Sequence, residues 1–264
     1  MHEKNALHKI LPGLESAVRK AGDLVVEHSV RPRNITHKGR IDLVTETDVA
    51  VEELLKEELH RLLPDADFLA EESANKTEPG ELTWVVDPLD GTTNFAHGLP
   101  FVANSVGLWC RDRIILGVVN LPLLGELFSA AEGHGTRLND KRVSVSSADA
   151  IEDALLATGF PYDIEKYLET VLRHFRTLLP LAQGIRRPGA AALDLAYVAC
   201  GRYDGFYESA LHPWDTAAGI LLVKEAGGRV SQFDAESPYH LGAESILATN
   251  GRLHGKLSQL LCSA

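Results

Sequence analysis

The chain has 264 residues, of which 45% are hydrophobic and 24% charged, and its formal net charge is −11. Such a chain can bury a sizeable core, as one large domain or two small ones. Its acidic balance argues against broad binding to nucleic-acid phosphates, and it has no run of about 18 apolar residues that could cross a membrane. The three cysteines are odd in number and widely spaced, and no apolar leader opens the sequence, so we expect a cytoplasmic protein with reduced thiols.

The first segments have the pattern of two helices joined by a polar stretch. Apolar residues recur at three- and four-residue steps over residues 7–25, which predicts an amphipathic helix. Residues 36–48 are polar and typical of an exposed loop. A second helix is expected to begin near Thr47 or Asp48, either of which can cap it, and to end before Pro64.

Strands and helices alternate irregularly along the rest of the chain. Apolar and β-branched runs predict strands at 67–71, 83–87, 101–110, 113–122, 126–133 and 138–146. After a short apolar run at 154–160, we expect helices at 164–179, 190–201, 215–228 and the end of the chain, and strands at 204–208, 229–234 and 245–250. This alternation favours a layered α+β or α/β architecture and leaves the strand order open.

The segment WVVDPLDGTTNFAHG at 84–98 places two acids at the end of an apolar strand. Asp87 and Asp90 flank an expected tight turn at Pro88, and the carbonyl of Leu89 lies between them. Two carboxylates and a carbonyl form an all-oxygen site, which hard cations such as magnesium prefer.

Groups suited to a phosphate follow directly. The amides from Gly91 onward could point at a phosphate oxygen, and Thr92 adds a hydroxyl. The alternative is an ordinary Asp-Pro turn in which Thr92 caps a helix.

Further acids occur elsewhere, and each is ambiguous alone. Glu71 and Glu72 end a predicted strand, where neighbouring side chains face opposite sides, so only one of them can face a given site. Asp215 precedes an apolar helix and could simply be its N-cap, as could Asp48 for the second helix.

Together these segments resemble the signature of the inositol monophosphatase family, which are lithium-sensitive, magnesium-dependent phosphatases. The signature combines a Glu-Glu pair, an Asp-Pro-x-Asp-Gly-Thr turn, and Trp-Asp followed by Gly-Gly. In this chain these are Glu71-Glu72, residues 87–92, Trp214-Asp215 and Gly227-Gly228, and their order and spacing fit throughout. The likeness covers nearly the whole chain.

The resemblance implies a fold and an activity. The fold is an α+β layered sandwich (α-β-α-β-α), shared with fructose-1,6-bisphosphatases, as one phosphatase domain over 1–264 that usually forms a homodimer. Its N-terminal half spans about 1–146 and its C-terminal half about 147–264. The activity is hydrolysis of a small phosphorylated polyol, with myo-inositol monophosphate as first candidate, to alcohol and inorganic phosphate by a metal-activated water.

Other substrates are known for this fold, and they stay open. They are fructose-1,6-bisphosphate, histidinol phosphate and 3′-phosphoadenosine 5′-phosphate. An alternative of another class is a non-catalytic interaction module that retains the fold.

The resemblance also implies a role for each matching residue. The ligands of two or three Mg²⁺ ions would be Glu71, Asp87, the carbonyl of Leu89, Asp90 and Asp215. Thr92, paired with Asp48, would polarise the attacking water. The substrate-binding set would be Glu71, Leu89, Asp90, Gly91, Thr92, Arg186, Gly189, Ala190, Ala191, Glu208 and Asp215.

Ala190 departs from the family pattern, Glu208 and Arg186 have alternative interpretations, and Lys38 in the polar loop is a further candidate. Ala190 stands where the family commonly has a hydroxyl residue, which puts one polar contact to the polyol in question. Glu208 could accept hydrogen bonds from vicinal hydroxyls, or it could be an exposed acid at a strand end. Arg186 resembles a bacterial family position near the substrate, a solvated surface arginine being the alternative. Lys38 is assigned only a loop role in metal or phosphate access.

Overall fold

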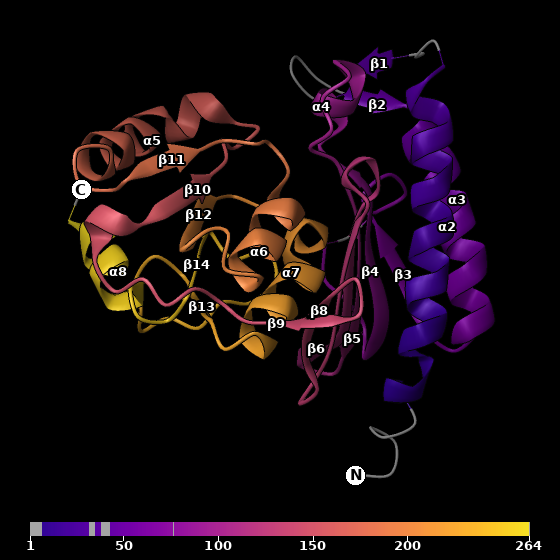
Figure 1. Ribbon diagram of the computed structural model, residues 1–264. Coiled ribbons are helices and arrows are strands. Elements are labelled where there is room, and N and C mark those ends of the chain that lie inside the picture. The colour runs from indigo at the N-terminus through magenta and orange to yellow at the C-terminus, as the bar shows by residue number, and fades with distance from the viewer. Residues whose placement is uncertain (1–6, 32–34, 38–42, 76, 264) are drawn as a thin grey trace.

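The structure is a computed structural model that describes residues 7–31, 35–37, 43–75 and 77–263. Five layers follow one another across it, as Figure 1 shows: a helix pair, a seven-stranded sheet, a second helix pair, a five-stranded sheet and a third helix pair. This arrangement confirms the predicted α-β-α-β-α sandwich. In the part of the chain that is described, no helix is both long and apolar enough to cross a membrane.

The first helix pair covers the outer face of the seven-stranded sheet. It consists of α2 (Leu11–Ser29), preceded by the 3₁₀ turn η1 (His8–Ile10), and α3 (Glu46–Leu62). The strands lie in the order β3 (Asp67–Ala70), β4 (Leu82–Asp90), β5 (Ala103–Cys110), β6 (Arg113–Leu121), β7 (Glu126–Ala131), β8 (Gly135–Leu138) and β9 (Lys141–Val143). Only β3 and β4 pair in parallel, and the turn η2 (Pro122–Leu124) joins β6 to β7.

Two short paired strands and the start of a helix occupy the described parts of the segment expected to be an exposed loop. Strands β1 (Ile35–His37) and β2 (Leu43–Thr45) pair antiparallel. Thr45 then caps α3: its hydroxyl accepts a hydrogen bond from the Thr47 amide at 3.2 Å, and the Asp48 carboxylate accepts one from the Thr45 amide at 2.8 Å. The predicted cap at Thr47 or Asp48 is therefore wrong, because Asp48 sits in the first turn and completes a capping box.

The second half of the chain builds the five-stranded sheet and its helices. The strands lie in the order β11 (Gly184–Arg186), β10 (Leu155–Thr158), β12 (Gly205–Ser209), β14 (Ser245–Thr249) and β13 (Arg229–Ser231). The helices are η3 (Ile151–Asp153), α4 (Thr92–Ala96, from the first half), α5 (Ile164–Leu178), α6 (Ala191–Ala199), α7 (Pro213–Glu225) and α8 (His254–Cys262). Helices α5 and α8 cover the outer face, while α6 and α7 lie between the two sheets.

Helix α7 lies unusually close to the seven-stranded sheet. Gly107 and Gly117 are paired on β5 and β6, directly beneath it. A Cβ atom at Gly117 would lie 2.9 Å from the carbonyl oxygen of Ala218, and one at Gly107 would lie 3.0 Å from the Cβ of Ala217. The two glycines therefore allow the contact that sets the position of α7.

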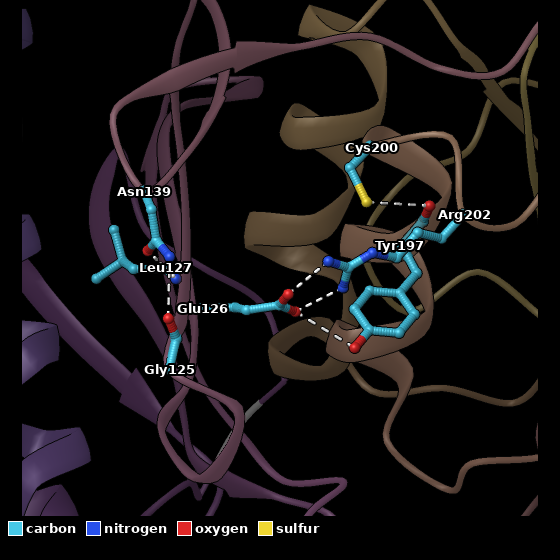
Figure 2. A network of polar contacts seen from close by, with 7 residues as sticks. All are labelled: Gly125, Glu126, Leu127, Asn139, Tyr197, Cys200 and Arg202. Carbon is cyan, nitrogen blue, oxygen red and sulfur yellow. Dashed lines mark hydrogen bonds and ion pairs between the residues drawn. The ribbon is translucent and has the colours of Figure 1, made fainter.

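A polar contact also connects the seven-stranded sheet to the end of α6 (Figure 2). The guanidinium of Arg202 donates two parallel hydrogen bonds to the carboxylate of Glu126, at 2.6 and 2.5 Å. The Tyr197 hydroxyl donates a longer one at 3.3 Å, and the guanidinium lies 4.5 Å from the centre of the Tyr197 ring. A two-pronged Arg–carboxylate pair fixes direction as well as distance, so it aligns the two halves of the chain.

Candidate active site

A cavity of about 240 Å³ opens where β4 ends and three helices begin. Helices α4, α6 and α7 start at Thr92, Ala191 and Pro213. The cavity is lined by Glu71, Asp87, Leu89, Asp90, Gly91, Thr92, Thr93, Gly159, Phe160, Tyr162, Arg187, Gly189, Ala190, Ala191, Glu208, Leu211 and Asp215. Because a helix N-terminus carries partial positive charge, this convergence favours an anion in the cavity.

Asp87 and Asp90 both lie on β4, not on either side of a turn. The register between β4 and β5 shifts between these two acids, so Pro88 and Leu89 form a bulge. Pro88 has no N–H to donate to the sheet, and its carbonyl accepts a hydrogen bond from the side-chain amide of Asn104 at 2.6 Å. The expected tight turn at Pro88 is thus a bulged strand, and both acids still line the cavity.

Three aspartates that line the cavity are oriented by backbone amides; Asp87 and Asp215 are buried and Asp90 is partly buried. The bonds are Leu89 N–H to Asp87 Oδ1 at 3.0 Å, Ala192 N–H to Asp90 Oδ2 at 2.7 Å, and His212 N–H to Asp215 Oδ2 at 2.7 Å. Each bond fixes one carboxylate oxygen and leaves the other as a potential ligand. Asp215 lies in the first turn of α7, whose N-cap is His212, so the alternative reading of Asp215 as N-cap is wrong.

Burial and mutual repulsion shape the charge of this acid group. Burial raises the pKa of Asp87 and of Asp215 well above the usual value, and the charge of Glu71 raises both further. Burial raises the pKa of Asp90 to about 7, against the lowering effect of the amides at the start of α6. Arg187 is the one basic side chain among the residues that line the cavity. Acids held so close favour a bound cation, which would let them ionise together.

The donor set suits a hard divalent cation such as Mg²⁺, which prefers oxygen ligands. The Leu89 carbonyl and Glu71 border the same cavity as the aspartates. Within the described ranges, no three His, Cys, Asp or Glu side chains are already grouped as a complete metal centre. Carbonyl and water oxygens would complete the ligand shell of a bound ion.

A hydroxyl and a buried carboxylate meet at one wall of the cavity. The Thr92 hydroxyl lies 2.9 Å from Asp48 Oδ1 and 3.0 Å from the Leu89 carbonyl oxygen, and it can donate its hydrogen bond to either of them. Asp48 Oδ2 accepts from both the amide and the hydroxyl of Thr45, at 2.8 and 2.5 Å. Burial raises the pKa of Asp48, and these donors oppose the rise. Asp48 lies behind Thr92 and does not itself line the cavity.

Thr92 is the first residue of α4, and Gly91 is its N-cap, so the alternative that Thr92 caps the helix is wrong. Gly91 has φ of 88°, in the left-handed region that glycine adopts without strain. Asn94 then connects α4 to the opposite wall, because its side-chain amide donates to the carbonyls of Pro188 at 2.9 Å and Gly189 at 3.3 Å. Sequence reasoning had not singled out Asn94.

Glu208 is buried inside the cavity wall at the end of β12, so its reading as an exposed strand-end acid is wrong. Burial raises its pKa to about 8, and Arg187 counteracts this. A Cβ at Gly159 would overlap the Glu208 carboxylate, so the glycine makes room for the acid. Glu71 lines the cavity and Glu72 does not, but β3 ends at Ala70 and both acids lie in the turn that follows, so strand alternation is not the cause.

The arginine at the cavity is Arg187, next to the expected Arg186. Arg186 ends β11 and does not line the cavity, whereas Arg187 does, with its guanidinium 4.7 Å from the centre of the Phe160 ring. Phe160 and Tyr162 also line the cavity, and no sequence motif marks them as site residues. Lys38 lies outside the described residues.

The chain is similar to proteins of one family along nearly its whole length. The model of the inositol monophosphatase family matches residues 6–264. The inositol-1-monophosphatase of Synechocystis sp. is 45% identical over 249 residues, covering 94% of this chain and 86% of that protein. The Nus factor SuhB of Escherichia coli strain K12 is 40% identical over 250 residues, covering 94% and 93%. The crystal structure of the extragenic suppressor protein suhB from Bartonella henselae has a TM-score of 0.90 and 40% identity, covering 96% and 98%.

Proposed function

Since the chain belongs to the inositol monophosphatase family and is a phosphoric monoester hydrolase of that metal-dependent group, we propose that it hydrolyses a small phosphorylated polyol with Mg²⁺. A myo-inositol monophosphate is the favoured substrate, with the alcohol and inorganic phosphate as products. One observation carries the proposal: Thr92, hydrogen-bonded to the buried Asp48, borders a cavity lined by five acids, at the meeting point of helix N-termini.

The chain's own oxygen atoms would hold two or three Mg²⁺ ions. The donors are Glu71, Asp87, the Leu89 carbonyl, Asp90 and Asp215. When bound, Mg²⁺ supplies positive charge for the phosphate oxygens and the leaving group, and it lowers the pKa of coordinated water.

Thr92 and Asp48 would orient the attacking water. When the Thr92 hydroxyl donates a hydrogen bond to Asp48, the lone pairs of the hydroxyl oxygen are free to accept a hydrogen bond from a water in the cavity. The raised pKa of Asp48 makes its carboxylate a better final acceptor for a proton that passes through the hydroxyl. Water attack in line with the leaving oxygen then needs no covalent phosphoenzyme.

Substrate recognition would divide between the phosphate and the polyol. The amides from Gly91 and the starts of α4 and α6 would contact phosphate oxygens. Glu208 would accept hydrogen bonds from neighbouring hydroxyls of the alcohol. Ala190 offers no hydroxyl at the position where the family often has one. A cavity of about 240 Å³ supports a small ring substrate over a nucleotide.

A substrate panel with Mg²⁺ present tests the assignment. It would hold myo-inositol 1-phosphate, fructose-1,6-bisphosphate, histidinol phosphate, 3′-phosphoadenosine 5′-phosphate and a generic aryl phosphate, ranked by kcat/KM. We expect the inositol ester to lead. A leading value for any of the other three metabolites would reassign the substrate within the same chemistry. No phosphate release from any of them would contradict the phosphatase proposal itself.

The alternative of another class is an interaction role on the same fold. The 40% identity to a relative named as a Nus factor favours it. Such a role would add to the chemistry, since all the acids of the implied site are retained. We further propose, from the family resemblance, one phosphatase domain over 1–264 that works as a cytoplasmic homodimer; sedimentation would test the dimer.

A further inference from the structure

A second cavity, of about 250 Å³, lies along the C-terminal half of α7, away from the active site at its start. It is as large as the active-site cavity, at about 240 Å³. The ends of β5, β6 and β7 form one wall, and α7 and the segment 239–241 form the other. None of the residues assigned to catalysis, metal or substrate lines it.

The cavity has an apolar floor. Ile114, Ile220 and Leu221 are 5, 6 and 5% exposed, so their side chains close the bottom of the cavity without offering it polar groups. Trp109 and Leu241 are partly buried at its sides. An indole face beside aliphatic side chains suits a flat or branched apolar group.

The acids around this floor already have ion-pair or hydrogen-bond partners. Arg113 binds Glu132 through Nε at 2.8 Å and Asp112 through Nη1 at 2.6 Å. Both carboxylate oxygens of Glu225 accept backbone N–H groups, from Gly133 and Gly135, at 2.8 Å each.

Two basic groups of the cavity, Lys224 and His240, differ from these acids. Among the described residues, neither the Lys224 ammonium nor the His240 ring has a hydrogen-bond or ion-pair partner, although both line the cavity. The Lys224 side chain is exposed and so is open to a ligand, and partial loss of water around its amine lowers its pKa. A single carboxylate placed there would pair with the ammonium by a charge-assisted hydrogen bond. The three nearby acids would repel a multiply charged anion such as a phosphate.

We propose that this cavity binds a small monocarboxylate with an aromatic or branched apolar body. The carboxylate contacts Lys224, and the apolar body lies against Trp109 and the floor formed by Ile220 and Leu221. The site differs from the active site in its ligand: one carboxylate and a hydrophobic group, without metal.

Three probes with one apolar body and different charge test this directly. They are 3-phenylpropionate, its neutral amide and the cation 3-phenylpropylamine, each titrated into the Mg²⁺-loaded enzyme while tryptophan fluorescence is followed. We expect a saturable change with affinity in the order carboxylate, amide, amine. Trp109→Phe should remove most of the signal, and inorganic phosphate at the active site should leave the affinity unchanged. The readout needs no turnover, so it is independent of the proposed phosphatase activity.

Matched lysine variants locate the carboxylate. Lys224→Met should weaken binding of 3-phenylpropionate by about tenfold, the scale of one charge-assisted hydrogen bond, and leave the amide unchanged. Lys256→Met, on the exposed surface of α8, should change neither. The proposal is overturned by the absence of a saturable change up to about 20 mM carboxylate, well above a weak-site Kd of ~1 mM. It is equally overturned by tighter binding of the amine, or by an unaltered affinity in Lys224→Met.

Discussion

The Thr92 hydroxyl and the Asp48 carboxylate are joined by a hydrogen bond of 2.9 Å across a sequence separation of 44 residues. Asp48 belongs to the first turn of α3 and Thr92 is the first residue of α4, so the bond connects two helix N-termini. Thr45 holds the other oxygen of Asp48 with two hydrogen bonds. The pair is therefore positioned from behind, and Thr92 is the member that lines the cavity.

Thr92→Ala should lower kcat by roughly a hundredfold, the scale of losing one positioned catalytic group, with a smaller change in KM. The reason is that alanine leaves the metal acids in place and removes only the group that orients water. Thr92→Ser keeps the hydroxyl and should retain most of the activity. Steady-state kinetics at saturating Mg²⁺ check both variants, and an unchanged kcat in Thr92→Ala would remove Thr92 from the mechanism.

Removal of metal should abolish turnover. The acids of the cavity are buried or partly buried and repel one another, and Arg187 is the one basic group among the lining residues. We expect no phosphate release in excess EDTA and full recovery on adding Mg²⁺. From the family resemblance we also expect inhibition by lithium. Full activity in EDTA would contradict the metal-dependent mechanism.

Asp215→Asn should separate folding from chemistry. Asparagine can still accept the hydrogen bond from the His212 amide, which Asp215 accepts at 2.7 Å, so α7 keeps its start. In EDTA we expect a melting temperature within about 2 °C of the parent. Loss of one negative ligand should nevertheless reduce kcat/KM severely across a Mg²⁺ titration. Near-normal turnover at ordinary Mg²⁺ would show that Asp215 is structural only.

Gly117→Ala should damage the site from a distance. The added Cβ would lie 2.9 Å from the Ala218 carbonyl oxygen, so α7 must move away from the sheet and take Asp215 with it. We expect a loss of about 1–3 kcal/mol in the free energy of unfolding and a raised Mg²⁺ requirement. Gly255→Ala is the matched control, because its Cβ would meet no atom within 4 Å. Equal behaviour of the two variants in denaturant melts would rule out this packing argument.

His254 should make stability fall in mild acid. Its ring is fully buried, with Nε2 2.8 Å from the Ser231 hydroxyl and Nδ1 2.9 Å from the Thr249 hydroxyl. The Ser231 hydroxyl donates to the Gln232 carbonyl, so the neutral ring donates from Nε2 and accepts at Nδ1. Burial lowers the pKa of His254 to about 4 from an ordinary 6.5.

The sign of the pH effect on stability follows from the lowered pKa of His254. Between pH 6.5 and pH 4 the unfolded chain binds a proton at His254 that the folded chain does not, so stability is complete above this window and falls as pH decreases through it. His254→Gln should make the difference in unfolding free energy between pH 7 and pH 4.5 smaller by about 2 kcal/mol. Denaturant melts at the two pH values measure this difference. An identical pH dependence in the variant would show that His254 does not cause it.

The helices and most strands could be predicted because their signals are local. The apolar steps over 7–25 reappear as α2, and the run at 164–179 as α5. Strand β11 has only three residues, with no alternation to detect. The start of α3 was misplaced because two threonines compete as caps, and only the contact between Thr45 and Asp48 decides.

The candidate site was predictable by residue type and less so by geometry. Acids after apolar strands are visible in a sequence, and Glu71, Asp87, Asp90 and Asp215 do line one cavity. The bulge at Pro88 depends on pairing with β5, which no local pattern encodes. The bond between Ala192 and Asp90 spans 102 residues, and Arg187 enters the cavity only because β11 joins the sheet where it does.

The place of α7 has a consequence for how the protein is made. Its helix begins at Pro213, yet it covers the inner face of a sheet whose last strand ends at Val143. On the ribosome, synthesis at about 5–20 residues per second leaves that apolar face open for several seconds or more before its cover emerges. The nascent chain must therefore be shielded by chaperones or stay loosely formed until more than four-fifths of it exists. Pulse proteolysis of ribosome-stalled chains ending before and after α7 would reveal the moment at which the sheet becomes resistant.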